Sequence, residues 1–316
     1  MIILLVLAGL YVGWNIGAND TANCIGIPVG SGLISYRKII YLVAVFVILG
    51  ALLQSHQVME TVGRGVARSP LNEKAVFAAM FSAGVFVTFA TFFKVPVSTS
   101  QAMVGGVVGA GLSMGSEVNL EQVVTIAEVW VISPLLTAAV SFLAYHLLAF
   151  FLKRVTMVLL WDRILSYLVI LSSGYVAFSL GANTVGTAVG PLAALAVNRV
   201  WLALMAGVAL SVGMITYGRR VTETVGKGIT RLDPLSAVAA QLSAAGAVNV
   251  FAYIGIPVST SQAIVGAIIG VGLVKGVKTV SLRKILKIVI GWVASPTAAG
   301  LLAFGVYKGI ELVGFL

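Results

Sequence analysis

The protein has 316 residues, of which 59% are hydrophobic and only 9% are charged. Soluble domains carry about a quarter of their residues as charged ones, so this composition excludes a water-soluble globular domain. The net charge of +10 does not indicate nucleic-acid binding, because the basic residues stand in short breaks between apolar runs. That placement fits loops held at anionic lipid surfaces. The single Cys24 excludes an intramolecular disulfide and a Cys-based metal site.

The first half contains apolar runs long enough to cross a bilayer, which takes about 20 residues. Residues 1–18 form the first run, and no basic segment precedes it, so we expect a membrane helix and not a removable signal peptide. This run ends at G-A-N-D-T-A-N, residues 17–23, and a segment of small residues follows to Tyr36. Further helices are predicted at about 38–54, 75–93 and 122–151.

A polar hexamer, P-V-S-T-S-Q at 96–101, interrupts the apolar sequence before the last of these helices. Its Gly-rich tail, about 102–114, is too short to span a bilayer comfortably and lacks charged flanks. These features favour a re-entrant hairpin, with irregular backbone buried inside protein. Gly105 and Gly109 form a G-x-x-x-G pattern that is typical of close helix packing.

The second half repeats the first. The hexamer recurs unchanged at 257–262, and G-A-N-T at 181–184 corresponds to the start of the first polar motif. Asn19 maps onto Asn183 with an offset of 164 residues, and Pro96 maps onto Pro257 with an offset of 161. The near-constant offset also relates T-V-G-R-G at 61–65 to T-V-G-K-G at 224–228, and W-x-x-S-P at 130–134 to the same pattern at 292–296.

We therefore predict an all-α polytopic membrane protein of roughly 10–12 membrane segments. Its parts are a first membrane repeat at 1–151, a central basic linker at 152–163 and a second membrane repeat at 164–316. Secondary transporters are often built from two such repeats, with the substrate held near the midplane where the repeats meet. The positive-inside rule does not decide whether the halves are inverted, because equivalent loops in both halves are basic.

Each hexamer has the features of a helix start. Ser98 and Ser259 are placed as N-caps, and Gln101 and Gln262 follow three residues later, as in a capping box. Capping alone does not require the hydroxyl pairs Thr99-Ser100 and Thr260-Ser261, whose burial in lipid costs several kcal/mol when they are unsatisfied. A helix N-terminus attracts anions, so we favour a site for a tetrahedral oxyanion over capping alone.

The motif at 17–23 contains Asp20, an acid inside an apolar region, where ionisable residues are usually functional. Its carboxylate, with neighbouring amide and hydroxyl oxygens, suits a hard cation such as sodium; proton uptake is the competing chemistry, and a plain helix cap at the headgroups is the structural alternative. The second copy keeps the amide at Asn183 but has Thr184 in place of the carboxylate. If cations bind, the first half therefore holds the better site.

With these motifs the chain resembles the inorganic phosphate transporter (PiT) family, which also includes related sulfate permeases. The resemblance spans nearly the whole chain and implies an inverted-repeat carrier with re-entrant hairpins, often dimeric, that moves phosphate with sodium or protons. It implies phosphate contacts from the two hexamers and coupling-ion contacts from the other motifs. By position, the phosphate residues are Ser98, Thr99, Ser100, Gln101, Ser259, Thr260, Ser261 and Gln262, and the coupling residues are Asn19, Asp20, Asn23, Asn183 and Thr184.

Two departures from the family pattern stand out. Thr184 occupies the position of a second Asp, which leaves the number and identity of the coupled cations open. The central linker is also short. The function predicted is cation-coupled phosphate symport in the plasma membrane, without a further cofactor. Sulfate or another oxyanion, a passive anion channel and a non-transporting sensor are the alternatives, whereas no nucleophile–base arrangement or ATP-binding loop indicates an enzyme.

Overall fold

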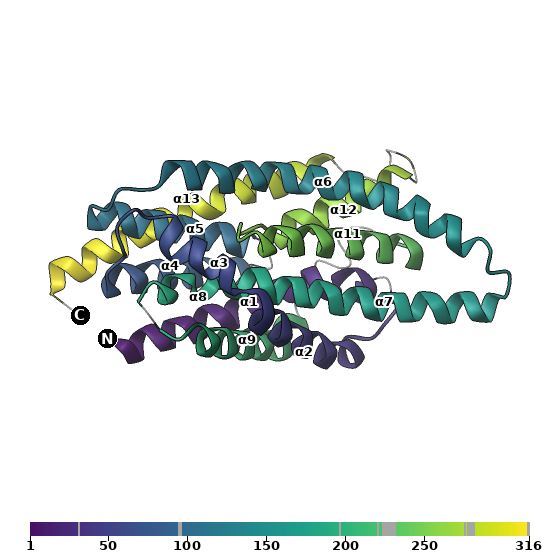
Figure 1. Cartoon of the computed structure of the whole chain (residues 1–316), viewed down its shortest axis with the longest axis horizontal. Coiled ribbons are helices and arrows are strands. Elements are labelled where there is room, and N and C mark those ends of the chain that lie inside the picture. The colour runs from purple at the N-terminus through teal and green to yellow at the C-terminus, as the bar shows by residue number, and fades with distance from the viewer. Residues whose placement is uncertain are drawn as a thin grey trace.

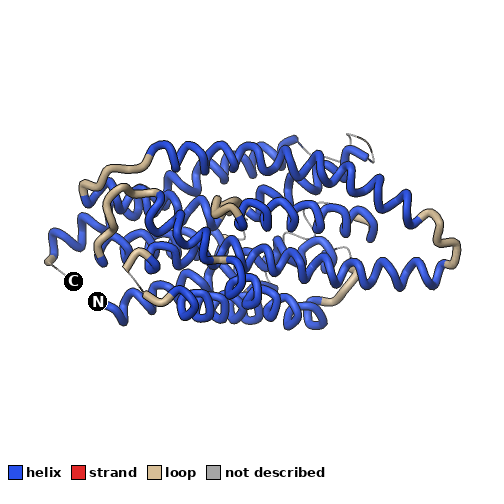
Figure 2. Tube along the Cα trace, viewed as in Figure 1, coloured by secondary structure: helices blue, strands red, loops and turns tan. Residues whose placement is uncertain are grey.

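Helices make up nearly all of the protein (Figure 2). The structure is a computed structural model that describes residues 1–30, 32–93, 97–195, 197–219, 221–222, 232–274, 276 and 282–314, with side chains left out at 282–288. Over these residues the only strand-type pairing is an isolated bridge between Ala67 and Val118. The helices are α1 (Ile2–Gly30), α2 (Tyr36–Gln54), α3 (His56–Glu60), η1 (Thr61–Gly65), α4 (Glu73–Phe92), α5 (Thr99–Met114), α6 (Leu120–Leu152), α7 (Val158–Leu180), η2 (Gly181–Val185), α8 (Gly186–Ala193), α9 (Arg199–Thr216), α11 (Pro234–Tyr253), α12 (Thr260–Val274) and α13 (Leu282–Val313).

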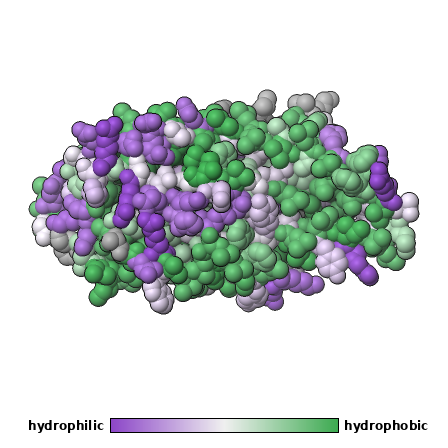
Figure 3. Space-filling view, viewed as in Figure 1, coloured by the Kyte–Doolittle hydropathy of each residue, from purple (hydrophilic) through white to green (hydrophobic). Residues whose placement is uncertain are grey.

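Eight of the described helical segments are long and apolar enough to cross a membrane. The outward-facing residues of α6 and α13 are large and apolar, as Leu135 and Leu301 illustrate, and apolar side chains dominate much of the face in Figure 3. The short helices α5 and α12 lie beside these spans. The prediction of an all-α polytopic membrane protein is confirmed.

The first helix differs from the prediction. The sequence indicated that the first apolar run ends at the motif 17–23, but α1 continues as one helix to Gly30. The motif is therefore helical and buried, because a helix satisfies the backbone polar groups that lipid would leave unpaired. The second copy of the motif forms η2, a π-helical turn between α7 and α8, and such turns are common at functional sites.

The central connection is shorter than the segment predicted as a linker. Helix α6 ends at Leu152 and α7 begins at Val158, so much of 152–163 belongs to α7.

Helices α4 and α5 form a hairpin. At its open end, the Asn119 N–H donates to the Val66 carbonyl (2.9 Å) and the Arg68 N–H donates to the Glu117 carbonyl (2.9 Å). The segments before α4 and after α5 thus lie side by side. The closed end leads to Ser98, which is buried, whereas Pro96 lies outside the described residues. Helices α11 and α12 form the corresponding pair, in which Gly255 takes a positive φ of 82° at the turn.

Each hairpin packs against the long helix of the other half. A Cβ added at Gly105 on α5 would lie 2.1 Å from the Pro296 carbonyl oxygen on α13. The matching position, Gly266 on α12, would place a Cβ 2.1 Å from the Pro134 oxygen on α6. The close packing predicted at the G-x-x-x-G pattern is confirmed, and the two halves interleave into one bundle.

The halves run in opposite directions. In Figure 1, α1 begins near the N-terminus at the left and runs to the right, whereas its counterpart α7 begins at the right and runs to the left. The same reversal relates α6 to α13. The repeat is therefore inverted. Residues 224–228, which repeat the T-V-G-R-G sequence of η1 as T-V-G-K-G, lie outside the described residues.

Candidate functional site

Two helix N-termini lie at the ends of the hairpins. The Ser98 side chain accepts a hydrogen bond from the Gln101 N–H (3.3 Å), and the Ser259 side chain accepts one from the Gln262 N–H (3.3 Å). Both serines are therefore the N-caps that the sequence predicts. The other N–H groups in the first turn of each helix have no carbonyl acceptor within the helix. These groups are therefore available to a ligand.

The glutamines do not complete the predicted capping boxes. The side-chain oxygens Gln101 Oε1 and Gln262 Oε1 are buried and have no hydrogen-bond partner in the described structure. A capping box would use these side chains to bond the backbone N–H of the cap. The Ser half of the box forms in both hairpins, so helix capping accounts for the serines and leaves the glutamine side chains unexplained.

Helix α1 presents Asp20 to the first hairpin. The Thr99 hydroxyl donates to Asp20 Oδ2 (2.9 Å), and Asn23 Nδ2 donates to Asp20 Oδ1 (3.2 Å). The Asp20 side chain is almost fully buried. Asn23 Nδ2 also donates to Ser261 Oγ (3.0 Å), on the second hairpin. One turn of α1 thus connects both hairpin tips.

The position of this turn depends on the packing of α1. A Cβ added at Gly17 would lie 1.9 Å from the Leu210 carbonyl oxygen on α9, so only glycine permits this approach. Pro28 lacks an N–H, which deprives the Cys24 carbonyl of its helical donor. Gln241 Nε2 on α11 donates to that carbonyl instead (2.9 Å). The proline four residues after Cys24 is the sequence signal for an unpaired helix carbonyl at this position, and Gln241 satisfies that carbonyl.

The second polar motif holds the second hairpin. Asn183 on η2 exchanges two hydrogen bonds with the Val258 backbone, as donor from Nδ2 (2.8 Å) and as acceptor at Oδ1 (3.0 Å). Asn183 Nδ2 also lies 3.4 Å from Ser100 Oγ on the first hairpin. The hairpins meet directly where Ser261 Oγ donates to the Val97 carbonyl (3.2 Å). Trp130 was a repeat landmark in the sequence, and its indole N–H donates to the Pro257 carbonyl (3.0 Å).

The structure thus joins six of the predicted site residues through side-chain hydrogen bonds between α1, η2 and the two hairpin tips: Asp20, Asn23, Thr99, Ser100, Asn183 and Ser261. The exceptions include the hydroxyls of Thr184 and Thr260, which are buried without a partner in the described structure. Asn19 donates from Nδ2 to Thr91 Oγ1 (3.0 Å), and its Oδ1 is likewise unpartnered there. A buried polar atom without a partner is costly and calls for an explanation such as an absent ligand or water.

The cluster contains one acidic side chain and no basic one. The helices α1, α5 and α12 and the turn η2 contain no Lys or Arg, and Asp20 is the only acid among them. Across the described residues, the ion pairs lie elsewhere, for example between Arg64 and Glu60 (3.5 Å). The site therefore combines neutral donors with a single carboxylate.

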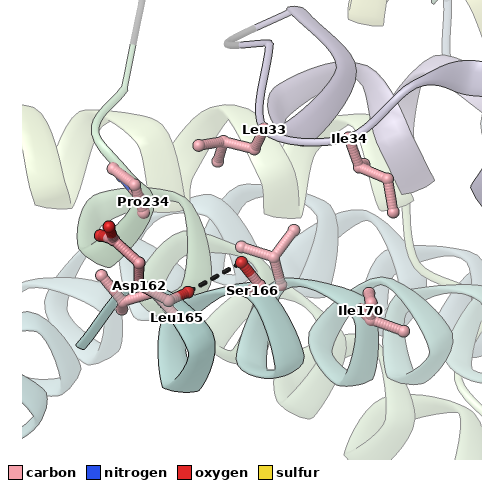
Figure 4. A pocket seen from close by; sticks show the side chains of 8 residues that line it. Leu33, Ile34, Asp162, Leu165, Ser166, Ile170 and Pro234 are labelled. Carbon is pink, nitrogen blue, oxygen red and sulfur yellow. Dashed lines mark hydrogen bonds between the residues drawn. The ribbon is translucent and has the colours of Figure 1, made fainter. Parts of the chain in front are cut away.

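A separate pocket of about 200 Å³ opens between the α1–α2 connection, α7 and the start of α11 (Figure 4). Apolar side chains such as Leu33 and Ile170 line much of it, together with Asp162 and Ser166. The Ser166 hydroxyl donates to the backbone carbonyl of Asp162 (2.8 Å). None of the residues predicted from the polar motifs lines this pocket.

Inverted repeats with hairpin tips that face each other define the architecture of a secondary transporter. The chain belongs to the phosphate transporter family, whose model matches residues 16–303. The resemblance noted in the two pairs of motifs is therefore confirmed.

Several relatives extend this similarity. A candidate phosphate permease of Methanocaldococcus jannaschii is 33% identical over 303 residues, covering 95% of this chain and 94% of the relative. One of Pyrococcus horikoshii is 30% identical over 399 aligned positions, covering 99% of this chain and 98% of the relative. Inorganic phosphate transporter 2-1 of Arabidopsis thaliana, a chloroplast protein, is 27% identical and covers 98% and 72% of the two chains.

A solved structure shares the fold. It is described as the sodium-dependent phosphate transporter, and it matches this chain with a TM-score of 0.87 at 25% identity, covering 98% of this chain and 99% of that one. The alignment of 399 positions with the P. horikoshii relative exceeds the 316 residues of this chain. That relative therefore carries insertions that this chain lacks.

Proposed function

We propose that this chain carries inorganic phosphate across the membrane together with sodium ions. The observation that carries the proposal is a set of neutral donors at two facing helix N-termini, placed beside a single buried carboxylate, Asp20. Membership of the phosphate transporter family supports phosphate as the substrate.

The anion would lie between the hairpin tips. Each tip offers first-turn N–H groups, the positive end of a helix dipole and hydroxyl groups, which together bind oxyanions without a fixed cation. Phosphate near neutral pH can both accept and donate hydrogen bonds, so it can also satisfy the unpartnered oxygens of Gln101 and Gln262. We assign the anion contacts to Ser98, Thr99, Ser100, Gln101, Ser259, Thr260, Ser261 and Gln262.

The cation follows from electrostatics. A phosphate anion beside Asp20 is repelled by the carboxylate, and α1, α5 and α12 carry no basic side chain that would offset that repulsion. A cation bound at Asp20 removes the repulsion and makes phosphate binding depend on it. The unpartnered Oδ1 of Asn19 is a further oxygen ligand next to Asp20 in the chain. Sodium is favoured over a proton because the solved structure with the same fold is described as sodium-dependent.

Other assignments complete the proposal. Asn23 orients the Asp20 carboxylate and reaches Ser261, so it couples the cation position to the second tip. Asn183 and Thr184 occupy the corresponding position of the second half. We place the carrier in the plasma membrane as a homodimer, with repeats at 1–151 and 164–316.

The experiment is uptake of radiolabelled phosphate into proteoliposomes that contain the purified protein. A sodium gradient, a proton gradient and no gradient are imposed in separate samples, and radiolabelled sulfate is the matched substrate. The proposal expects phosphate accumulation driven by sodium alone and little accumulation of sulfate. Accumulation driven only by protons would replace sodium as the coupling ion, sulfate preference would replace the substrate, and flux that ignores both gradients would exclude a symporter.

A further inference from the structure

The anion-binding parts of the site obey the internal repeat, but the carboxylate does not. Asp20 accepts a hydrogen bond from Thr99 in the first half. The repeat maps Asp20 onto Thr184, with an offset of 164 residues, and maps Thr99 onto Thr260, with an offset of 161. The carboxylate–hydroxyl pair of the first half thus corresponds to two hydroxyls in the second.

Both of these hydroxyls lack a hydrogen-bond partner. Thr184 Oγ1 and Thr260 Oγ1 are buried and have no hydrogen-bond partner in the described structure. In the first half, the matching Thr99 hydroxyl is satisfied by Asp20. The second half thus has threonine where the first half has the longer carboxylate side chain of Asp20. The two buried hydroxyls of the second half lack the kind of partner that Asp20 provides for Thr99.

The glycine contacts between helices also correspond between the two halves. A Cβ added at Gly17 would lie 1.9 Å from the Leu210 carbonyl oxygen. A Cβ added at its counterpart, Gly181, would lie 2.0 Å from the Val47 carbonyl oxygen. The repeat also maps Val47 onto Leu210, so the two contacts are equivalent. The two hydrogen bonds between Asn183 and Val258 also place η2 against the start of α12. Thr184 and Thr260 therefore belong to the same region.

The neighbouring asparagines show the same asymmetry. Asn19 Oδ1 has no hydrogen-bond partner in the described structure. Its counterpart, Asn183 Oδ1, accepts a hydrogen bond from the Val258 N–H (3.0 Å) and so is already used to hold the hairpin. The first half offers a carboxylate and an open amide oxygen where the second half offers a hydroxyl and an engaged amide oxygen.

No other carboxylate of the described second half replaces the missing one. The second repeat contains three acids. Asp233 caps α11 through the Ser236 N–H (3.0 Å), and Glu311 pairs with Lys308 near the C-terminus (2.7 Å). The third, Glu223, lies outside the described residues.

From this asymmetry we propose that the second half of the site, at Thr184 and Thr260, holds a neutral occupant such as water, and that the carrier moves a single sodium ion with each phosphate. A water molecule satisfies both hydroxyls, because each hydroxyl donates and accepts. A sodium ion there would lack the charged oxygen that Asp20 supplies in the first half. This inference rests on the proposed sodium–phosphate symport and adds its stoichiometry.

The test measures radiolabelled sodium and phosphate taken up by the same proteoliposomes and compares wild type with Thr184→Asp. The wild type is expected to take up one sodium ion per phosphate. Thr184→Asp restores the carboxylate beside Thr260, so the ratio of sodium to phosphate is expected to rise about twofold and the sodium dependence of uptake to steepen. Thr184→Asn is the matched control, because it changes the side chain without adding charge and is expected to keep the wild-type ratio.

The wild-type ratio decides the inference even if Thr184→Asp fails to fold. Two or more sodium ions per phosphate in the wild type would overturn it, as would an unchanged ratio in a folded, active Thr184→Asp variant. An equal rise in the Thr184→Asn control would also contradict it, because charge would then not be the cause. Phosphate uptake without any sodium uptake would instead refute the proposed symport, so the two failures are distinguishable.

Discussion

At the scale of single residues, the site differs from an ordinary anion pocket in its use of neutral groups. The Thr99 hydroxyl and the Asn23 amide donate to the carboxylate of Asp20, and the side-chain oxygens of Asn19, Gln101 and Gln262 are buried without a partner in the described structure. Oxygen atoms without donors suit a cation or a protonated phosphate oxygen, and N-terminal N–H groups suit an anion. A joint site for both ions satisfies groups that either ion alone would leave unpaired.

We propose that Asp20 makes phosphate uptake depend on sodium. Asp20→Asn keeps the size of the side chain and removes the charge, so we expect uptake in proteoliposomes to lose its response to an imposed sodium gradient. Asp162→Asn is the matched control, because Asp162 is an exposed acid near the start of α7 and lies outside the hydrogen-bonded cluster. A sodium response retained in Asp20→Asn would contradict the assignment.

The hexamer hydroxyls are expected to bind phosphate directly. Ser100→Ala and Ser261→Ala each remove one hydrogen bond to a charged ligand, which is worth about 1.5–3 kcal/mol, or at least about tenfold in affinity. The measurement is the KM for phosphate at saturating sodium. Ser113→Ala serves as the control, because Ser113 is buried on the same helix α5 but donates only to the Ala110 carbonyl (2.8 Å). Equal KM values in all variants would leave only a capping role for the hexamers.

At the scale of helices, glycines decide how closely the hairpins approach the long helices. Gly105 and Gly109 on α5 face Pro296 and Gly300 on α13, and Gly266 repeats this arrangement on α12. The G-x-x-x-G pattern allowed the close packing to be predicted. The partner helix was not predictable, because a stripe of small residues does not specify which helix approaches it.

Gly109→Ala tests this packing. The added Cβ would lie 2.0 Å from the Gly300 carbonyl oxygen, and a backbone atom cannot move aside as a flexible side chain does. Overpacking of this kind typically costs about 1–3 kcal/mol, so we expect a lower midpoint of thermal unfolding in detergent. Gly246→Ala on α11 is the control, because nothing lies within 4 Å of its Cβ position. Equal losses in the two variants would show that the contact does not matter.

The ends of the helices were harder to predict from the sequence than the close packing. Most predicted membrane helices lie close to observed ones. The polar motif at 17–23, however, predicts an end to the first helix, whereas α1 continues to Gly30. Polar residues in an apolar sequence indicate either a helix end or a buried site, and the difference depends on neighbours that are distant in the chain. Here Gln241 and the backbone of α9 supply those neighbours.

At the scale of the whole molecule, the inverted repeat explains how one site is built from two halves. The hairpin tips meet where Ser261 Oγ donates to the Val97 carbonyl, and each hairpin packs against a helix of the other half. The repeat and the pairing of its motifs were predictable from the near-constant offset. The inversion and the interleaving were not derivable from the loop charges, because basic residues occupy equivalent loops in both halves.

The repeat also shows which features the two halves share and which they do not. The caps at Ser98 and Ser259 are equivalent, with the same 3.3 Å bond in each hairpin. The carboxylate at Asp20 has no equivalent at Thr184. We therefore propose that this carrier combines a symmetric anion site with an asymmetric cation site.

The most direct test of that description is the affinity of the purified protein for phosphate, measured calorimetrically at a series of sodium concentrations with ionic strength held constant by choline. If sodium at Asp20 removes the repulsion of the anion, phosphate affinity rises with sodium by about 5- to 150-fold, and phosphate raises sodium affinity by the same factor. In Asp20→Asn this linkage is expected to disappear. A wild-type phosphate affinity that does not change with sodium would contradict the account.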